Sequence, residues 1–278
     1  MKKKIFIAYA DANLAYSLKR ICRQARRLGI FDEVILYTPN DLPDYIKQSP
    51  LMQYEKGGGY WAWKPVILHE TLQSHEEGDI VVYADAGCTL NQSTEWDMMF
   101  KLMLEYDTIC FHYDAEMPVW AKWGNTSTKI KYWTKQSALS FLDDYCGDNA
   151  YRESYKIWGG LLFLKGKNNS FLSKWLEITM NHPEVIIDPI GKEQEEQPAG
   201  FAFHKHDQSV ITALAYYDDK TLVLPEISET HGETSFVWAE RLRARNLNQF
   251  IMEKSKHLIR LFLGDALVDC IKRPFIKF

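Results

Sequence analysis

The chain has 278 residues, 46% of them hydrophobic, which suffices for a substantial core in one large domain or two small ones. Lysine and arginine total 33 against 37 aspartate and glutamate residues, so the net charge of −4 gives no electrostatic case for nucleic acid as a partner. The five cysteines form no CxxC pair and are odd in number, which argues against a disulfide framework or zinc ribbon and favours reduced thiols.

The N-terminal segment has a basic head, and its apolar run IFIAYA ends at Asp11, which is too short for a secretory signal. We interpret residues 5–9 as a first β-strand. No window approaches about eighteen uninterrupted apolar residues, so the sequence predicts no membrane-spanning helix. The expected location is cytoplasmic, and attachment to the inner face of the cell membrane stays open.

Strand and helix patterns alternate to about residue 225. Apolar residues at helical spacing follow the first strand, Gly29 ends that helix, and residues 33–38 form a second strand. Such a β-α-β unit favours parallel strands with a right-handed crossover. Further strands are predicted at residues 80–84, 107–112, 158–166 and 221–225. Helices are predicted after Pro65, after Ser93 or Thr94, over 127–145, after Ser170 and from 204–207.

This order of elements predicts an α/β fold in which a central, mostly parallel sheet is flanked by helices. We expect one domain over residues 1–235 and a helical C-terminal segment over 236–278. Prolines, glycines and polar residues predict surface loops at 114–124 and 188–200, where ligand contacts often lie.

The stretch 57–88 carries the strongest functional signal. Three consecutive glycines followed by Tyr60, Trp61 and Trp63 form a loop that backbone and ligand can approach closely. The strand IVVYA then leads into Asp85, and open α/β sheets bind ligands at the C-terminal ends of their strands. A carboxylate there can bind a divalent cation or a ribose hydroxyl, or it can cap the next turn.

Four motifs follow one another along the chain: GxGYWxWKP at 57–65, GDIxxYxDAG at 78–87, WGGLLFL at 158–164 and HDQS at 206–209. In these motifs and their order the sequence resembles glycosyltransferases of the GT-A fold, in particular bacterial capsule and lipopolysaccharide enzymes. The resemblance implies a Rossmann-like GT-A domain that moves a sugar from a nucleotide diphosphate donor, with a UDP-sugar as the leading donor. The implied acceptor is a hydroxyl of a surface polysaccharide or lipid-linked glycan.

The resemblance also implies the roles of individual residues. The nucleotide-sugar donor would be bound by Tyr9, Ala10, Asp11, Gly59, Tyr60, Trp63, Lys64, Asp85, Ala86, Gly87, Gly159 and Gly160. Asp207 and Gln208 would be catalytic, either as the base for the acceptor hydroxyl or as the group on the other face of the sugar. Asp85 and His231 would hold a divalent cation, Mn²⁺ or Mg²⁺, that neutralises the diphosphate.

The motif departs from the family pattern because Gly87 stands where a DxD motif has its second aspartate. Three interpretations stay open: Asp85 binds the metal with help from elsewhere, it holds the sugar or ribose, or the enzyme works without a cation. Lys64 can then supply positive charge to the diphosphate.

Structural roles compete with several of these assignments. Tyr9 at a strand end can be core packing, Lys64 a solvated residue, and Asp207 a helix N-cap. The glycines at 159–160 can serve close strand packing, and His231 can be an exposed loop histidine.

Two other functions stay open on the sequence. The missing second aspartate is compatible with a pseudoenzyme that binds a nucleotide sugar without turnover. His204, His206 and Asp207 lie close enough in sequence to suggest a metal-dependent hydrolase, although an isolated HxH pair is weak evidence for a zinc site.

The C-terminal region is basic and apolar. Arg241, Arg243 and Arg245 lie two apart, so they cannot share one face of a helix, and they are candidates for binding diphosphate or acidic acceptor groups, or for simple solvation. Residues 251–278 contain six lysines and arginines against three acids. Such a helix can lie on anionic lipid, pack on the domain, or contact a partner in a homodimer.

Overall fold

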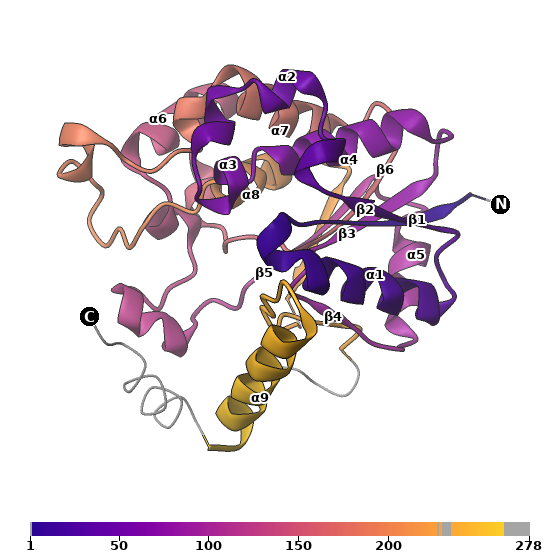
Figure 1. The fold of residues 1–278 in the computed structure, drawn as a ribbon. Helices are drawn as coiled ribbons and strands as arrows, with labels where there is room; N and C mark the ends of the chain where they lie inside the picture. The colour runs from indigo at the N-terminus through magenta and orange to yellow at the C-terminus, as the bar shows by residue number, and fades with distance from the viewer. Residues whose placement is uncertain (1, 227, 230–234, 264–278) are drawn as a thin grey trace.

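The computed structural model describes residues 2–226, 228–229 and 235–263, and its centre is a six-stranded sheet (Figure 1). The strand order is β2-β1-β3-β6-β5-β7. The strands are β1 (Lys4–Tyr9), β2 (Glu33–Tyr37), β3 (Ile80–Ala84), β5 (Thr108–His112), β6 (Leu161–Lys165) and β7 (Thr221–Pro225). β6 runs antiparallel to β3 and β5, whereas the β1–β2, β1–β3 and β5–β7 pairings are parallel. The predicted α/β class with a mostly parallel central sheet is confirmed.

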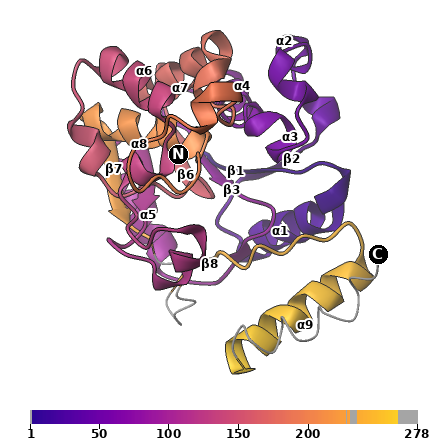
Figure 2. The same ribbon diagram turned by 90° about the vertical axis from the view of Figure 1, so that its left-hand side faces the viewer.

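Helices cover both faces of this sheet (Figures 1 and 2). One face carries α1 (Ala15–Leu28) and α5 (Glu95–Leu102). The other carries a layer of helices that contact one another: α4 (Trp63–Ser74), α6 (Gln136–Cys146), α7 (Ser170–Asn181) and α8 (Asp207–Tyr217). Short helices α2 (Asp44–Lys47) and α3 (Gly57–Tyr60) precede α4. Because both faces are covered, every residue of β3 is buried, as its continuous apolar sequence IVVYA predicts.

Some predicted boundaries shift. The helix predicted over 127–145 begins at Gln136, because the preceding residues form a 3₁₀ turn and Lys129 makes a β-bridge with Tyr155. The strand predicted over 158–166 is shorter, and the two glycines at 159–160 lie in the turn before β6.

The C-terminal part of the chain differs most from the prediction. The helix expected from about residue 236 begins at Leu247, as α9 (Leu247–Leu263). Before it, β8 (Val237–Trp238) pairs antiparallel with β4 (Thr89–Leu90), and the chain from there to α9 forms neither helix nor strand. α9 packs on α1, where the Phe250 ring lies 5.3 Å from the Tyr16 ring between centroids. Within the described ranges no helix has the length and apolar character that crossing a membrane requires. Most of the predicted membrane-contact segment, residues 264–278, lies outside those ranges.

Candidate functional site

A cavity of about 770 Å³ lies where β1 and β3 end. Four parts of the chain line it, together with Trp158: the residues after β1, the loop before α4, the residues after β3, and the segment between β8 and α9. The lining residues are Tyr9, Ala10, Asp11, Asn13, Leu14, Glu55, Lys56, Gly57, Gly58, Trp61, Trp63, Tyr83, Asp85, Ala86, Gly87, Cys88, Trp158, Ala239, Arg241, Arg243, Arg245 and Gln249. This size is in the range of small-molecule and cofactor sites, and the location is where open α/β sheets bind ligands.

The glycine-rich loop is held in a conformation that requires its glycines. Gly57, Gly58 and Gly59 all have positive φ, at 62°, 59° and 93°. A Cβ on Gly57 would lie 2.5 Å from the Trp61 ring, and one on Gly59 would lie 2.8 Å from the sulfur of Met52. Larger residues would therefore force the loop to change shape.

Two aromatic contacts fix this loop against the sheet. The Trp63 indole N–H donates to the Gly57 carbonyl at 2.9 Å, and the Trp63 ring stacks on Tyr9 with 3.8 Å between centroids. Tyr9 is therefore packed against protein on one face of its ring while it still lines the cavity. Tyr9 can therefore pack against the protein and also contact a ligand in the cavity.

We expect Gly59→Ala to destabilise the protein more than Gly124→Ala does. Both glycines have φ of 93°, but a Cβ on Gly124 would meet nothing within 4 Å. Gly124→Ala should cost about 1–2 kcal/mol from backbone strain alone, and Gly59→Ala a further 1–3 kcal/mol or so from overpacking. Urea unfolding of the two variants measures this difference, and equal losses would contradict the assigned packing of the loop.

Asp85 presents its carboxylate to the cavity from the end of β3. Its backbone N–H donates to the Gly160 carbonyl at 2.9 Å, and the Tyr83 hydroxyl donates to its Oδ1. The side chain is nevertheless 44% exposed, so it has room for a further partner. Burial, reinforced by the Asp85 charge, raises the pKa of Tyr83 well above its usual value, so this hydroxyl stays protonated as a donor.

Lys64 and Asp207 form a buried ion pair next to Asp85. Lys64 is 2% and Asp207 4% exposed, and the Lys64 Nζ lies 2.9 Å from Asp207 Oδ2 and 3.9 Å from Asp85 Oδ1. The same ammonium donates to the Gly159 carbonyl at 2.9 Å. Burial disfavours the charge of Lys64, but the two carboxylates outweigh it, and the net effect raises its pKa.

Lys64, Asp85 and Asp207 lie close together, as the sequence predicts, but they do not all face the cavity. Asp85 lines the cavity, whereas the ammonium of Lys64 is directed at protein groups rather than at a ligand. Gly159 lies against the pair, because a Cβ there would lie 3.2 Å from Asp207 Oδ2 and 3.4 Å from Lys64 Nζ. Lys64 therefore links the C-terminal end of β3 to the start of α8.

Other predicted residues also contact protein groups. The Gln208 side-chain oxygen accepts from the buried Lys156 Nζ at 2.9 Å. The Tyr60 hydroxyl donates to Asp188 at 3.0 Å. The predicted residues that line the cavity are Tyr9, Ala10, Asp11, Trp63, Asp85, Ala86 and Gly87. Those outside its lining are Gly59, Tyr60, Lys64, Gly159, Gly160, Asp207 and Gln208. His231 lies outside the described residues.

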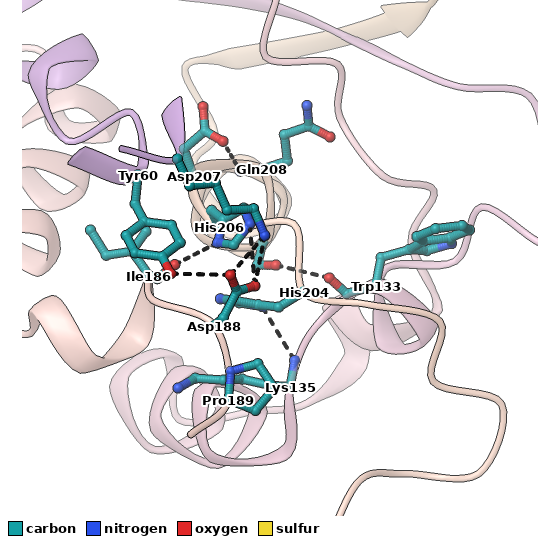
Figure 3. Close-up of polar contacts among 12 residues, drawn as sticks. Tyr60, Trp133, Lys135, Ile186, Asp188, Pro189, His204, His206, Asp207 and Gln208 are labelled. Atoms are coloured by element: carbon teal, nitrogen blue, oxygen red, sulfur yellow. Dashed lines mark hydrogen bonds and ion pairs between the residues drawn. The ribbon is translucent and has the colours of Figure 1, made fainter. Parts of the chain in front are cut away.

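The histidines of the suggested hydrolase site have other partners (Figure 3). His204 contacts the Val185 carbonyl at 2.9 Å through Nε2 and accepts from the Lys135 N–H through Nδ1. His206 contacts the Ile186 carbonyl at 2.7 Å through Nδ1. Figure 3 shows the carboxylate of Asp207 pointing away from both rings. Across the described ranges no three His, Cys, Asp or Glu side chains form a metal-ligand group.

Three arginines line the cavity from the segment 239–245, which we call the strap. In Figure 2 the strap runs from β8 to α9 alongside α1. Leu242 and Ala244 are buried, and the alternating positions Arg241, Arg243 and Arg245 line the cavity. Their spacing of two excludes a shared helical face, and the strap is indeed non-helical, with Arg241 at a positive φ of 53°.

Comparisons with known proteins give little beyond the fold. No family model matches the chain, and no curated protein matches it. Among solved structures, a glycosyltransferase involved in glycosylating the major capsid of PBCV-1 is 10% identical, with 91% of this chain and 99% of that chain covered and a TM-score of 0.47. The bifunctional glycosyltransferase WbbM is 10% identical, with 91% and 44% covered and a TM-score of 0.43.

The bifunctional IspDF of Campylobacter jejuni is also similar, at 10% identity, with 84% of this chain and 52% of that chain covered and a TM-score of 0.39. The chain thus spans about half the length of WbbM or IspDF. At such identities and TM-scores the likeness does not indicate a function for this chain.

Proposed function

We propose that this protein is a glycosyltransferase that uses a nucleotide diphosphate sugar, with a UDP-sugar as the first donor to test, and a hydroxyl acceptor in a surface polysaccharide or lipid-linked glycan. The observation that carries the proposal is the cavity at the ends of β1 and β3, which places an exposed carboxylate, stacked aromatic rings and arginines around one space. These groups match hydroxyls, the apolar faces of a base or sugar, and phosphates, respectively. The resemblance of the four sequence motifs to those of GT-A glycosyltransferases supports the same function.

Within this proposal Asp85 is the catalytic or sugar-binding carboxylate of the cavity. It can accept hydrogen bonds from hydroxyls of the donor, and the Tyr83 hydroxyl and Gly160 carbonyl hold it in place. Asp207 acts as a positioning residue, because its buried carboxylate fixes Lys64, and Lys64 in turn lies 3.9 Å from Asp85. Gln208, bound to Lys156, stays a candidate for a contact with the reacting sugar.

A divalent cation at Asp85 stays a prediction, because few carboxylate oxygens at the cavity are available to bind it. Asp85 offers one carboxylate, of which one oxygen already accepts from Tyr83. The Asp11 carboxylate, also at the cavity, accepts from the backbone and side-chain nitrogens of Asn13. Mg²⁺ can be held by one carboxylate together with substrate phosphates, so Asp85 is the residue that would hold it, and the ion would supply positive charge to the diphosphate.

Donor turnover tests the proposal. The purified protein is incubated with UDP-, GDP- and CDP-sugars, with EDTA or with Mn²⁺, and nucleoside diphosphate release is measured with and without added glycans. We expect release from at least one donor. Binding of a nucleotide sugar without any release would instead support the pseudoenzyme, an alternative favoured by the burial of Asp207. If the protein neither binds nor turns over any donor of the panel, both functions are refuted.

A further inference from the structure

The strap passes closely over the end of β3 and is fixed there by backbone hydrogen bonds. The Leu242 N–H donates to the Gly87 carbonyl at 3.0 Å. The Ser17 hydroxyl donates to the Leu242 carbonyl at 2.7 Å and accepts from the Ala244 N–H at 3.0 Å. The Ala244 carbonyl accepts from the N–H groups of Tyr16 and Ser17. These hydrogen bonds fix the backbone of Leu242 and Ala244, so the neighbouring arginines project from a fixed position.

Position 87 has little room for a side chain while the strap lies there. A Cβ on Gly87 would be 3.1 Å from the Arg241 Cα, 3.2 Å from the Arg241 carbonyl carbon and 3.2 Å from the Leu242 nitrogen. These are backbone atoms, so a side chain at position 87 would have to push the strap backbone away by a few tenths of an ångström. The strap in its present position therefore disfavours an aspartate at position 87, the missing second acid of the DxD motif.

The strap brings positive charge to the cavity that Asp85 and Gly87 also line. Arg243 makes no hydrogen bond or ion pair with any residue that the structure describes. Arg245 donates to the neutral Asn13 side chain at 2.8 Å, so its charge is not compensated there. Arg241 is paired with Glu229. Of the other charged groups at the cavity, Lys56 is paired with Asp188, and Asp11, Glu55 and Asp85 are acidic.

We infer that the strap arginines, Arg243 and Arg245, bind the diphosphate of the donor and neutralise it in place of a divalent cation. The inference rests on the proposed function, since it concerns how the same cavity holds a nucleoside diphosphate. A guanidinium group offers two parallel N–H donors that match phosphate oxygens, and it keeps its charge at all relevant pH values. Gly87 stands where a DxD motif has its second acid, and its lack of a side chain lets the strap backbone lie this close.

Calorimetric titration tests this inference with UDP, GDP and CDP as probes, each in EDTA and in Mn²⁺. The variants are Arg243→Gln and Arg245→Gln, and the matched control is Arg27→Gln, an exposed arginine of α1 outside the cavity lining. We expect the wild-type protein to bind at least one probe in EDTA. Arg243→Gln should weaken that binding about tenfold or more, as loss of a charge-assisted hydrogen bond does, and Arg27→Gln should leave it unchanged.

Two results would overturn the inference and leave the proposed function intact. One is wild-type binding that appears only with Mn²⁺, and the other is binding to both strap variants with wild-type affinity. Absence of binding to every probe under both conditions would overturn the inference together with the proposed function. Circular dichroism of the variants confirms that they are folded, which is expected because the side chains of Arg243 and Arg245 are exposed.

Discussion

Asp85→Ala is expected to reduce sugar transfer by about a hundredfold or more. The carboxylate accepts from the Tyr83 hydroxyl and lies 3.9 Å from the Lys64 ammonium, while the backbone N–H of Asp85 donates to the Gly160 carbonyl. The side chain of Asp85 is 44% exposed. Removing one such preorganised polar group from an active site costs about 10²–10³ in rate. The measurement is the steady-state rate with the best donor of the panel, compared with Asp219→Ala, which removes an exposed carboxylate elsewhere on the surface.

The kinetic pattern also assigns the role of Asp85. A fall in kcat with an unchanged KM indicates an interaction made in the transition state, whereas a raised KM alone indicates donor binding. Asp85→Asn keeps the size of the side chain and one acceptor oxygen, so it should retain more donor binding than alanine does. Wild-type affinity and turnover in Asp85→Ala would mean that the cavity at the ends of β1 and β3 is not the site of the reaction.

Local patterns in the sequence predict the part of the site that the sheet positions. Strand β3 can be read from its apolar run, and Asp85 follows it directly, so the carboxylate at the C-terminal end of a strand is predictable. Asp207 at the start of α8 is predictable for the same reason, since a polar segment precedes an apolar helical pattern. The chain directions of β1 and β3 follow from the β-α-β order.

The partners of these residues cannot be read from local patterns. Lys64 is buried because Asp207, 143 positions later in the chain, neutralises it, and the loop sequence alone suggests a solvated lysine. The strap is non-helical because Ser17 and Gly87 bind its backbone, although its composition also suits a helix. In both cases a contact between distant residues decides between two local interpretations of comparable strength.

Lys64→Met is expected to lower the free energy of unfolding by about 3–5 kcal/mol, because it leaves the buried Asp207 carboxylate without its cation. That loss is a large share of the 5–15 kcal/mol or so by which a typical domain is stable. The measurement is urea unfolding at pH 7. Lys64→Met combined with Asp207→Asn removes both charges, so the double variant should recover more than half of the lost stability.

The same pair of variants separates stability from function. If Lys64 and Asp207 hold Asp85 in place, the double variant regains stability but transfers sugar slowly, because the ammonium 3.9 Å from Asp85 is gone. Lys64→Arg keeps a positive charge and should retain more activity than the double variant. A double variant with both wild-type stability and wild-type transfer would show that the buried pair does not position Asp85.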